Sequence, residues 1–293
     1  MEHHIPVLLT ETLETLNIEP NDIVLDGTMG FGGHGSEIVN KLATGKYIGL
    51  DRDPKAIKHC KELFKENKNV HIIQQDYANF PDVLEKLKFN KVSKILLDIG
   101  ISSYQLDSAK RGFSFQKEEP LDMRMDPKSE LTAEKILNQY SEELLTKVIF
   151  EYGEIRNYHK FIANVINMRT ETPMLTTFDL VNMIKKSFYF RNKRSIYIRT
   201  CAQVFQALRI EVNQELNQLK GFLEHLESRL EIGARVAIIT FHSLEDRIVK
   251  QYFKGKKYTF KPIEKKVIKA KQEEIRINSR AKSAKLRCVE LIG

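Results

Sequence analysis

Residues 23–54 read IVLDGTMGFGGHGSEIVNKLATGKYIGLDRDP, and this stretch decides the fold. The apolar, β-branched run 23–25 predicts a short strand that ends at Asp26. Residues 27–35 hold five glycines in nine, which predicts a tight loop that a ligand can approach closely. Residues 36–43 then predict a helix, and 47–50 a second strand that ends at Asp51. A strand, loop, helix and strand in this order indicate an α/β fold.

The loop and the two acids that flank it predict a nucleotide-like cofactor. Gly30, Gly32 and Gly35 match the G-x-G-x-x-G pattern of dinucleotide sites, and Asp51, about twenty residues on, is placed to accept hydrogen bonds from ribose hydroxyls. Asp26 favours a different ligand, because a carboxylate at that point attracts the cationic amino acid end of S-adenosylmethionine and repels a pyrophosphate. We therefore expect S-adenosylmethionine, with a dinucleotide or a purely structural turn as alternatives.

Composition limits the class of protein. The chain has 293 residues, of which 42% are hydrophobic and 29% charged, as in an ordinary soluble globular protein. It has no apolar run of about 18 residues and no basic then apolar leader, so we expect a cytoplasmic protein without a membrane partner. Cys60, Cys201 and Cys288 are far apart, which argues against a disulfide framework or a zinc site, and we expect no metal.

The net charge of +8 is unevenly distributed. Residues 254–287 carry thirteen Lys or Arg and three Glu, and residues 181–210 carry seven Lys or Arg and no acid. The second segment also contains Phe188, Tyr189, Phe190 and Tyr197. Cations beside aromatic rings are typical of proteins that bind unpaired RNA, although a charged run can also be a solvated face.

Further strands place more polar residues at the same edge of the sheet. Residues 70–74 predict a third strand, followed by a loop in which Phe80 either lies on an adenine or caps the core. The run KILLDIG, 94–100, predicts a buried fourth strand with one acid, Asp98, at its exit. An acid there is costly unless it is used, so Asp98 is the best candidate for the reacting centre; capping the next turn is its structural alternative.

The fifth strand, 235–241, comes more than 130 residues after the fourth, which predicts an insert between them. The insert contains helical patterns at 132–139, 142–150, 155–168 and 178–188, and one long helix is expected over 201–230. We therefore expect a first core part at 1–108, a helical RNA-substrate insert at 109–200, and a second core part at 201–293 that ends in a basic hairpin. His242 follows the fifth strand and is either a scaffold residue or a second catalytic candidate.

Ten short blocks follow one another along the chain: HIPVLLTE from His4, DGTMGFGGHG from Asp26, GLDRDPKAI from Gly49, LLDIGISSYQLD from Leu96, RGFSF from Arg111, PLDMRMD from Pro120, YGE from Tyr152, FQALRIEVNQEL from Phe205, FHSLEDRIVK from Phe241 and NSRAKSAKLR from Asn278. In this order they resemble the bacterial ribosomal small-subunit RNA (cytosine-N4)-methyltransferases, the RsmH or MraW family. The chain departs from the family at 199–204, RTCAQV, and at Ser279, where proline is usual. Both departures concern how RNA is held.

The resemblance implies a class I, Rossmann-like S-adenosylmethionine-dependent methyltransferase sheet with a helical insert domain between strands 4 and 5. It implies methylation of the exocyclic N4 amine of a cytidine in the decoding region of 16S rRNA, with the small ribosomal subunit as partner. The family's cofactor contacts fall on Gly32, Gly33, His34, Asp51, Phe80, Asp98 and Gln105. For catalysis we expect Asp98 to accept an amine hydrogen, with His242 as the weaker candidate.

Three alternatives remain open on the sequence. The chain could be a non-catalytic RNA-binding assembly factor that keeps a methyltransferase-like fold, a dinucleotide-dependent oxidoreductase, or a methyltransferase that acts on DNA or protein. The sequence also leaves open whether the protein is a monomer or a homodimer.

Overall fold

A computed structural model describes residues 6–101, 106, 110–191 and 193–293. The chain forms two compact units, one made of Met1–Gly100 with Leu216–Gly293 and the other of Ile101–Glu215. This second unit extends beyond the expected insert, 109–200, at both ends. The expected end at 200 would fall inside the helix α10, Arg194–Asn213, which packs against the other insert helices along its length.

The first unit is built on a seven-stranded sheet in the order β3-β2-β1-β4-β5-β7-β6. Its strands are β1 Ile23–Asp26, β2 Lys46–Asp51, β3 Val70–Gln74, β4 Val92–Asp98, β5 Leu230–Thr240, β6 Phe260–Pro262 and β7 Lys285–Leu291. β1 to β5 are parallel, whereas β7 is antiparallel to both β5 and β6. This confirms the Rossmann-like sheet, and the expected tail strands are the antiparallel pair β6 and β7.

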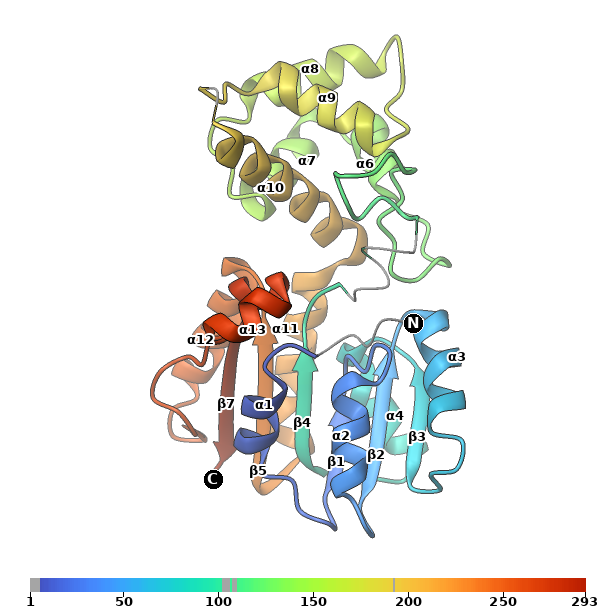
Figure 1. Ribbon diagram of the computed structural model, residues 1–293, viewed down its shortest axis with the longest axis vertical. Coiled ribbons are helices and arrows are strands. Elements are labelled where there is room, and N and C mark those ends of the chain that lie inside the picture. The colour runs from blue at the N-terminus through green and yellow to red at the C-terminus, as the bar shows by residue number, and fades with distance from the viewer. Residues whose placement is uncertain (1–5, 102–105, 107–109, 192) are drawn as a thin grey trace. The chain divides into compact units, whose positions relative to one another are not determined.

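Helices cover both faces of this sheet (Figure 1). One face packs on α1 Leu9–Leu16, α2 Gly33–Lys41 and α3 Pro54–Leu63, and also meets the short α13, Gln272–Ile277. The other face packs on α4 Phe80–Lys86, α11 Glu215–Leu226 and α12 Ser243–Gly255. Alternate residues of β4 enter the two cores, with Leu96 in the first and Ile95 and Leu97 in the second. A strand buried on both faces explains the continuous apolar run in the sequence.

The strand order fixes where a ligand can bind. From β1 the chain moves outward through β2 and β3, then returns to β4 on the other side of β1. In an open α/β sheet, ligands bind beyond the carboxyl ends of the strands at this reversal. The reversal lies between β1, which ends at Asp26, and β4, which ends at Asp98.

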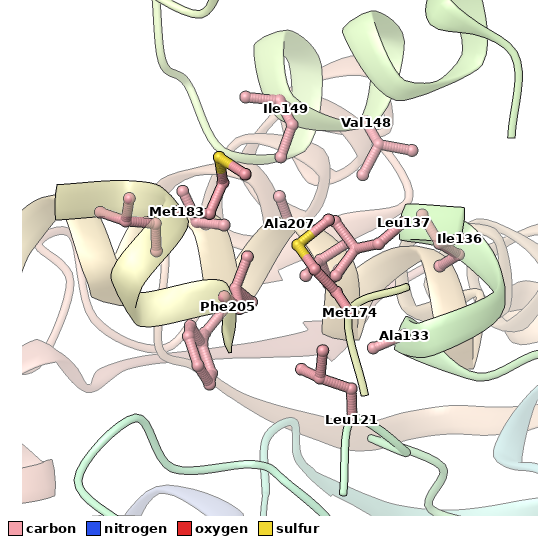
Figure 2. Close-up of a cluster of buried hydrophobic side chains, with 14 of the residues drawn as sticks. Leu121, Ala133, Ile136, Leu137, Val148, Ile149, Met174, Met183, Phe205 and Ala207 are labelled. Atoms are coloured by element: carbon pink, nitrogen blue, oxygen red, sulfur yellow. The ribbon is translucent and has the colours of Figure 1, made fainter. Parts of the chain in front are cut away.

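The second unit is helical and has its own core. It contains α6 Ala133–Gln139, α7 Glu142–Lys147, α8 His159–Arg169, α9 Thr177–Ser187 and α10 Arg194–Asn213. Figure 2 shows part of this core, where Leu121, Ile136, Met174 and Phe205 are among the labelled side chains that gather between the helices. A capping box begins α9, because Thr176 accepts a hydrogen bond from the backbone N–H of Asp179 and Asp179 accepts one from that of Thr176.

The single long helix expected over 201–230 is wrong. The helix is interrupted at Gln214, between α10 and α11, where the backbone is left-handed with φ of 51°. Asn213 is held just before the break, since its side chain accepts from the N–H of Met125 and donates to the carbonyl of Met123. Contacts with a distant loop, rather than a local glycine or proline, fix this helix end.

No helix among the described residues is long and apolar enough to cross a membrane.

Candidate active site

Three acids end three neighbouring parallel strands: Asp51 on β2, Asp26 on β1 and Asp98 on β4. The glycine loop 27–35 is joined to all three strands. Gly27 N–H donates to the carbonyl of Leu96, Met29 N–H donates to that of Leu50, and the Thr28 hydroxyl accepts from Asp98 N–H at 2.6 Å. The loop therefore lies across the carboxyl edge of the sheet, at the strand reversal.

Glycine is required in this loop at two kinds of position. Gly30 and Gly32 have φ of +54° and +83°, in the left-handed region that other L-residues rarely adopt. Gly33 needs space instead, because a Cβ there would lie 2.6 Å from Cγ of Pro6. The expected helix, 36–43, begins earlier than predicted, at Gly33, with Gly32 as its N-cap. The first-turn N–H groups of such a helix point toward the loop side and suit a ligand with hydrogen-bond acceptors.

Asp26 is almost completely buried and is held by two donors. The hydroxyl of Tyr47 donates to its Oδ2 at 2.8 Å, and the N–H of Thr28 donates to its Oδ1 at 3.1 Å. Burial raises the pKa of Asp26 to about 7, against the lowering effect of these bonds. Gly35 makes room for the tyrosine, since a Cβ at Gly35 would lie 2.5 Å from the Tyr47 hydroxyl oxygen.

This contact predicts an energetic coupling between Gly35 and Tyr47. Gly35→Ala adds a methyl group against the Tyr47 hydroxyl and is expected to lower the free energy of unfolding by about 1–3 kcal/mol. In a Tyr47→Phe background the hydroxyl is gone, so the same substitution should cost about 1 kcal/mol less. Urea unfolding of the two single variants and the double variant measures the difference.

Gly221→Ala is the matched control for this cycle. Gly221 is also helical, in α11, but a Cβ there would meet only Cβ of Ala78, at 3.5 Å. This substitution should be neutral or should stabilise the protein by up to about 1 kcal/mol, because alanine favours helix. Strictly additive costs of Gly35→Ala and Tyr47→Phe would contradict the contact.

Asp51 shapes the loop from the second strand. Its Oδ2 accepts from the N–H of Gly30 and its Oδ1 from the N–H of Asp53, each at 2.8 Å. Burial raises the pKa of Asp51 to about 6, although both backbone bonds act in the opposite direction. A carboxylate oxygen has two lone pairs, so each oxygen keeps capacity for a ligand hydroxyl.

Asp98 has the least satisfied carboxylate of the three. Its Oδ1 is buried and has no hydrogen-bond partner among the residues described, and its Oδ2 lies 3.8 Å from Nδ1 of His34. Burial raises the pKa of Asp98 to about 7, and the charges of Asp26 and Glu245 add to this effect. Residues 102–105 of the turn that Asp98 could cap lie outside the described residues, so both the reacting-centre interpretation and the capping one stay predictions.

His34 is buried, and its Nε2 lies 3.1 Å from the carbonyl oxygen of Val7. It therefore ties the segment before α1 to the start of α2. With Gly32 and Gly33, His34 is brought to the same edge as the three acids. Gln105 lies outside the described residues.

Both aromatic residues that follow β3, Tyr77 and Phe80, are buried in the core. Phe80 is fully buried, and its ring centroid lies 5.2 Å from that of Phe222 in the core between α4 and α11. Its ring therefore fits the core alternative. Tyr77, in the short 3-10 turn before α4, lies against the loop, since a Cβ on Gly27 would be 2.9 Å from Cβ of Tyr77. Sequence reasoning missed Tyr77, although it stands in the same loop.

His242 acts as a helix cap. It is the N-cap of α12: its side chain accepts from the N–H of Glu245, and the buried Glu245 carboxylate accepts from the N–H groups of Phe241 and His242. Nε2 of His242 lies 2.9 Å from Oε1 of Glu245. These contacts favour the scaffold interpretation of His242 over the catalytic one.

Comparisons with known proteins identify the family that the chain matches. A family model described as the MraW methylase family matches residues 1–292. "Ribosomal RNA small subunit methyltransferase H" of Clostridium botulinum (strain Kyoto / Type A2) is 44% identical over 302 aligned residues, which cover 97% of each chain. Proteins of the same name from Clostridioides difficile (strain 630) and Thermotoga neapolitana are each 42% identical, and the alignments cover 99% of this chain and 99% and 96% of theirs.

Proposed function

The chain belongs to the MraW methylase family, and we propose that it methylates the exocyclic N4 amine of a cytidine in the decoding region of 16S ribosomal RNA. It is an S-adenosylmethionine-dependent methyltransferase, as the family match over nearly the whole chain shows. The names of its relatives support the small-subunit substrate. The N4 position and the decoding region rest on the resemblance of the ten sequence blocks. A ribosomal substrate would place the protein in the cytoplasm.

One observation carries the proposal: an edge of three carboxylates and a glycine loop fits a cationic nucleoside ligand. The buried Oδ1 of Asp98 has no hydrogen-bond partner among the described residues and is suited to accept from a polar group of the ligand or substrate. Within the loop, a Cβ at Gly30 would meet nothing closer than the carbonyl oxygen of Thr28, at 3.9 Å, so a ligand has space there. We propose that the charge of Asp26 attracts the cationic amino acid end and that Asp51 accepts hydrogen bonds from the ribose.

The remaining contacts would come from the loop and its surroundings. Gly32, Gly33 and His34 would meet the ligand through the start of α2, and Tyr77 would flank it beside Gly27. Gln105 is a proposed contact on the resemblance alone. All of these residues come from one chain, so the proposal calls for no dimer.

S-adenosylmethionine, when bound, supplies an electrophilic methyl group on a sulfonium. The chain's own residues must then hold the amine and take its proton, because the lone pair of a cytosine amine is delocalised into the ring. Asp98 is proposed to accept a hydrogen bond from that amine, which localises the lone pair on nitrogen. A carboxylate with a pKa of about 7 is also well matched to take up the proton near neutral pH.

Binding of this cofactor should depend on pH. Asp26, Asp51 and Asp98 have pKa values raised to about 7, 6 and 7, so lowering the pH through this range protonates them and removes negative charge from the site. The sulfonium cation then loses attraction. We expect the Kd of S-adenosylmethionine to rise as pH falls from about 8 to about 6, by up to tenfold per pH unit for each proton taken up.

S-adenosylhomocysteine is the control, because it has the same amino acid end but no sulfonium charge. Calorimetric titration of both ligands across the pH range isolates the contribution of that charge. The Kd of S-adenosylhomocysteine should change less with pH. Parallel pH profiles for the two ligands would show that the three carboxylates do not sense the sulfonium.

Transfer of labelled methyl groups to unmodified small ribosomal subunits tests the proposed substrate. The proposal expects the label in 16S rRNA and none in large subunits. Label in protein or DNA instead would move the substrate to one of the alternatives above. Cofactor binding without transfer to any ribosomal RNA would contradict the proposed function and keep the fold assignment.

A further inference from the structure

The turn between α9 and α10 carries a surface of exposed cations around one exposed ring. We define the α9–α10 surface as Lys185, Lys186, Tyr189, Arg191, Lys193 and Arg194, all of which are exposed. None of its cations forms an ion pair with another described residue. Residues 180–210 contain no Asp or Glu, so the positive charge is not neutralised within this segment.

The charges at the start of α10 are unfavourable for the helix itself. Lys193 is its N-cap without a side-chain hydrogen bond, Arg194 begins the helix, and its first turn has no acid. Cations at a helix N-terminus oppose the helix dipole, by about 0.3–1 kcal/mol each. Residues that break a local rule in this way are typical of functional surfaces, and here an anionic partner would offset the cost.

Tyr189 is the exposed ring of this surface, at 85% exposure. Its two neighbours are anchored: Phe188 stacks on Phe161 with centroids 5.6 Å apart, and Phe190 packs edge-on against Tyr197 at 5.4 Å. The N–H of Lys193 donates to the carbonyl of Phe190 and closes the turn. Because the turn is fixed on both sides of Tyr189, its ring is presented to solvent at little further cost in conformational entropy.

The combination of an exposed ring and neighbouring cations selects one kind of partner. Cations alone would suit any polyanion, including duplex RNA, through its phosphates. An exposed aromatic ring adds stacking, which requires a base face that a duplex keeps within its own stack. The surface therefore fits unpaired RNA better than a helix of RNA.

We propose that the α9–α10 surface binds an unpaired stretch of the RNA substrate, with Tyr189 stacked on a base and the neighbouring cations paired with phosphates. The inference rests on the proposed function, because it takes ribosomal RNA as the substrate. Its specific content is the choice of unpaired over duplex RNA and the role of Tyr189 in that choice.

The test compares two charge variants of the same unit. The surface variant replaces Lys186, Lys193 and Arg194 by Gln. The control variant replaces three other lysines of this unit by Gln: Lys128, Lys135 and Lys147. These lysines are also exposed, and the control removes the same amount of charge. Affinity for a fluorescent single-stranded RNA and for a duplex of equal length is measured between about 0.05 and 0.2 M salt.

The affinity of the surface variant for the single strand should depend less steeply on salt than that of the wild type. Three phosphate contacts account for a change of about 2 in the slope of log K against log salt, at about 0.7 for each contact. The control variant should keep the wild-type slope. Equal slopes in the surface variant and the wild type would overturn the phosphate contacts.

Tyr189 is tested by Tyr189→Ala and Tyr189→Phe. Loss of the ring should weaken single-strand binding about 5- to 150-fold and leave duplex binding unchanged, whereas phenylalanine should restore it. Equal weakening for both RNAs, or none, would overturn the stacking role. Methylation of small subunits by the wild-type protein is measured separately, so that failure of the proposed function can be distinguished from failure of this surface.

Discussion

Asp98→Asn is expected to lower the rate of methyl transfer by about 10²–10⁴-fold, the range for loss of a positioned proton acceptor. The amide keeps the size and one acceptor oxygen of the carboxylate but takes up no proton. Single-turnover transfer to small ribosomal subunits measures the rate, and calorimetry measures the affinity for S-adenosylmethionine. Asp82→Asn, at an exposed acid of α4, is the control and should leave both unchanged. Full transfer by Asp98→Asn would show that the proton leaves by another route.

The same substitution should leave the protein at least as stable at mildly alkaline pH. The pKa of Asp98 is raised to about 7 in the folded protein, from an ordinary value of 3.8. A carboxyl whose pKa is raised on folding adds stability at low pH, and that contribution is lost as pH rises through the folded value. Asp98→Asn removes this loss, so its Tm relative to wild type should be higher at about pH 8 than at about pH 5. A functional residue that costs stability is expected at an active site.

Asp51→Ala should have the second large effect, a loss of affinity for S-adenosylmethionine of about 10²-fold or more. The substitution removes two hydrogen bonds to a charged acceptor, from Gly30 and Asp53, each worth about 1.5–3 kcal/mol. It also removes the proposed acceptor for the ribose. Calorimetry on the purified variant gives the affinity directly.

Asp53→Ala is the matched control for that experiment. Asp53 is two residues away and buried, but it caps α3 by accepting from the N–H of Lys55 at 3.0 Å. Its loss should lower stability by about 1 kcal/mol and change cofactor affinity little. If Asp53→Ala weakened binding as much as Asp51→Ala, the effect would come from general destabilisation of the edge and not from the loop contact.

Much of the first unit could be predicted from local patterns. The runs ending at Asp26, Asp51 and Asp98 are strands with these acids at their exits, because short apolar runs that stop at an acid are characteristic of buried parallel strands. The start of α2 at Gly33 was not predicted. Gly32 is the N-cap of this helix through its left-handed backbone and has no side chain that would mark the position as a cap in the sequence. The break at Gln214 was missed for a similar reason, as it depends on bonds between Asn213 and a loop about ninety residues away.

The site was predictable where strand ends determine it and was not where packing determines it. The role of Tyr47 as a hydrogen-bond donor to Asp26 could not be predicted from the sequence. This bond joins two strands and depends on the space left by Gly35. The aromatic residue was harder still. Tyr77 and Phe80 share one loop and both enter the core, and only the short turn between β3 and α4 brings Tyr77 against Gly27 as well.

The central claim is methylation at the N4 amine of cytidine, and identification of the product nucleoside tests it most directly. Small subunits methylated by the purified protein would be digested with nuclease, and the labelled nucleoside would be identified by mass and retention time against standards. The account predicts N4-methylcytidine in 16S rRNA. A methyl group on cytosine C5, on a ribose hydroxyl or on another base would contradict it.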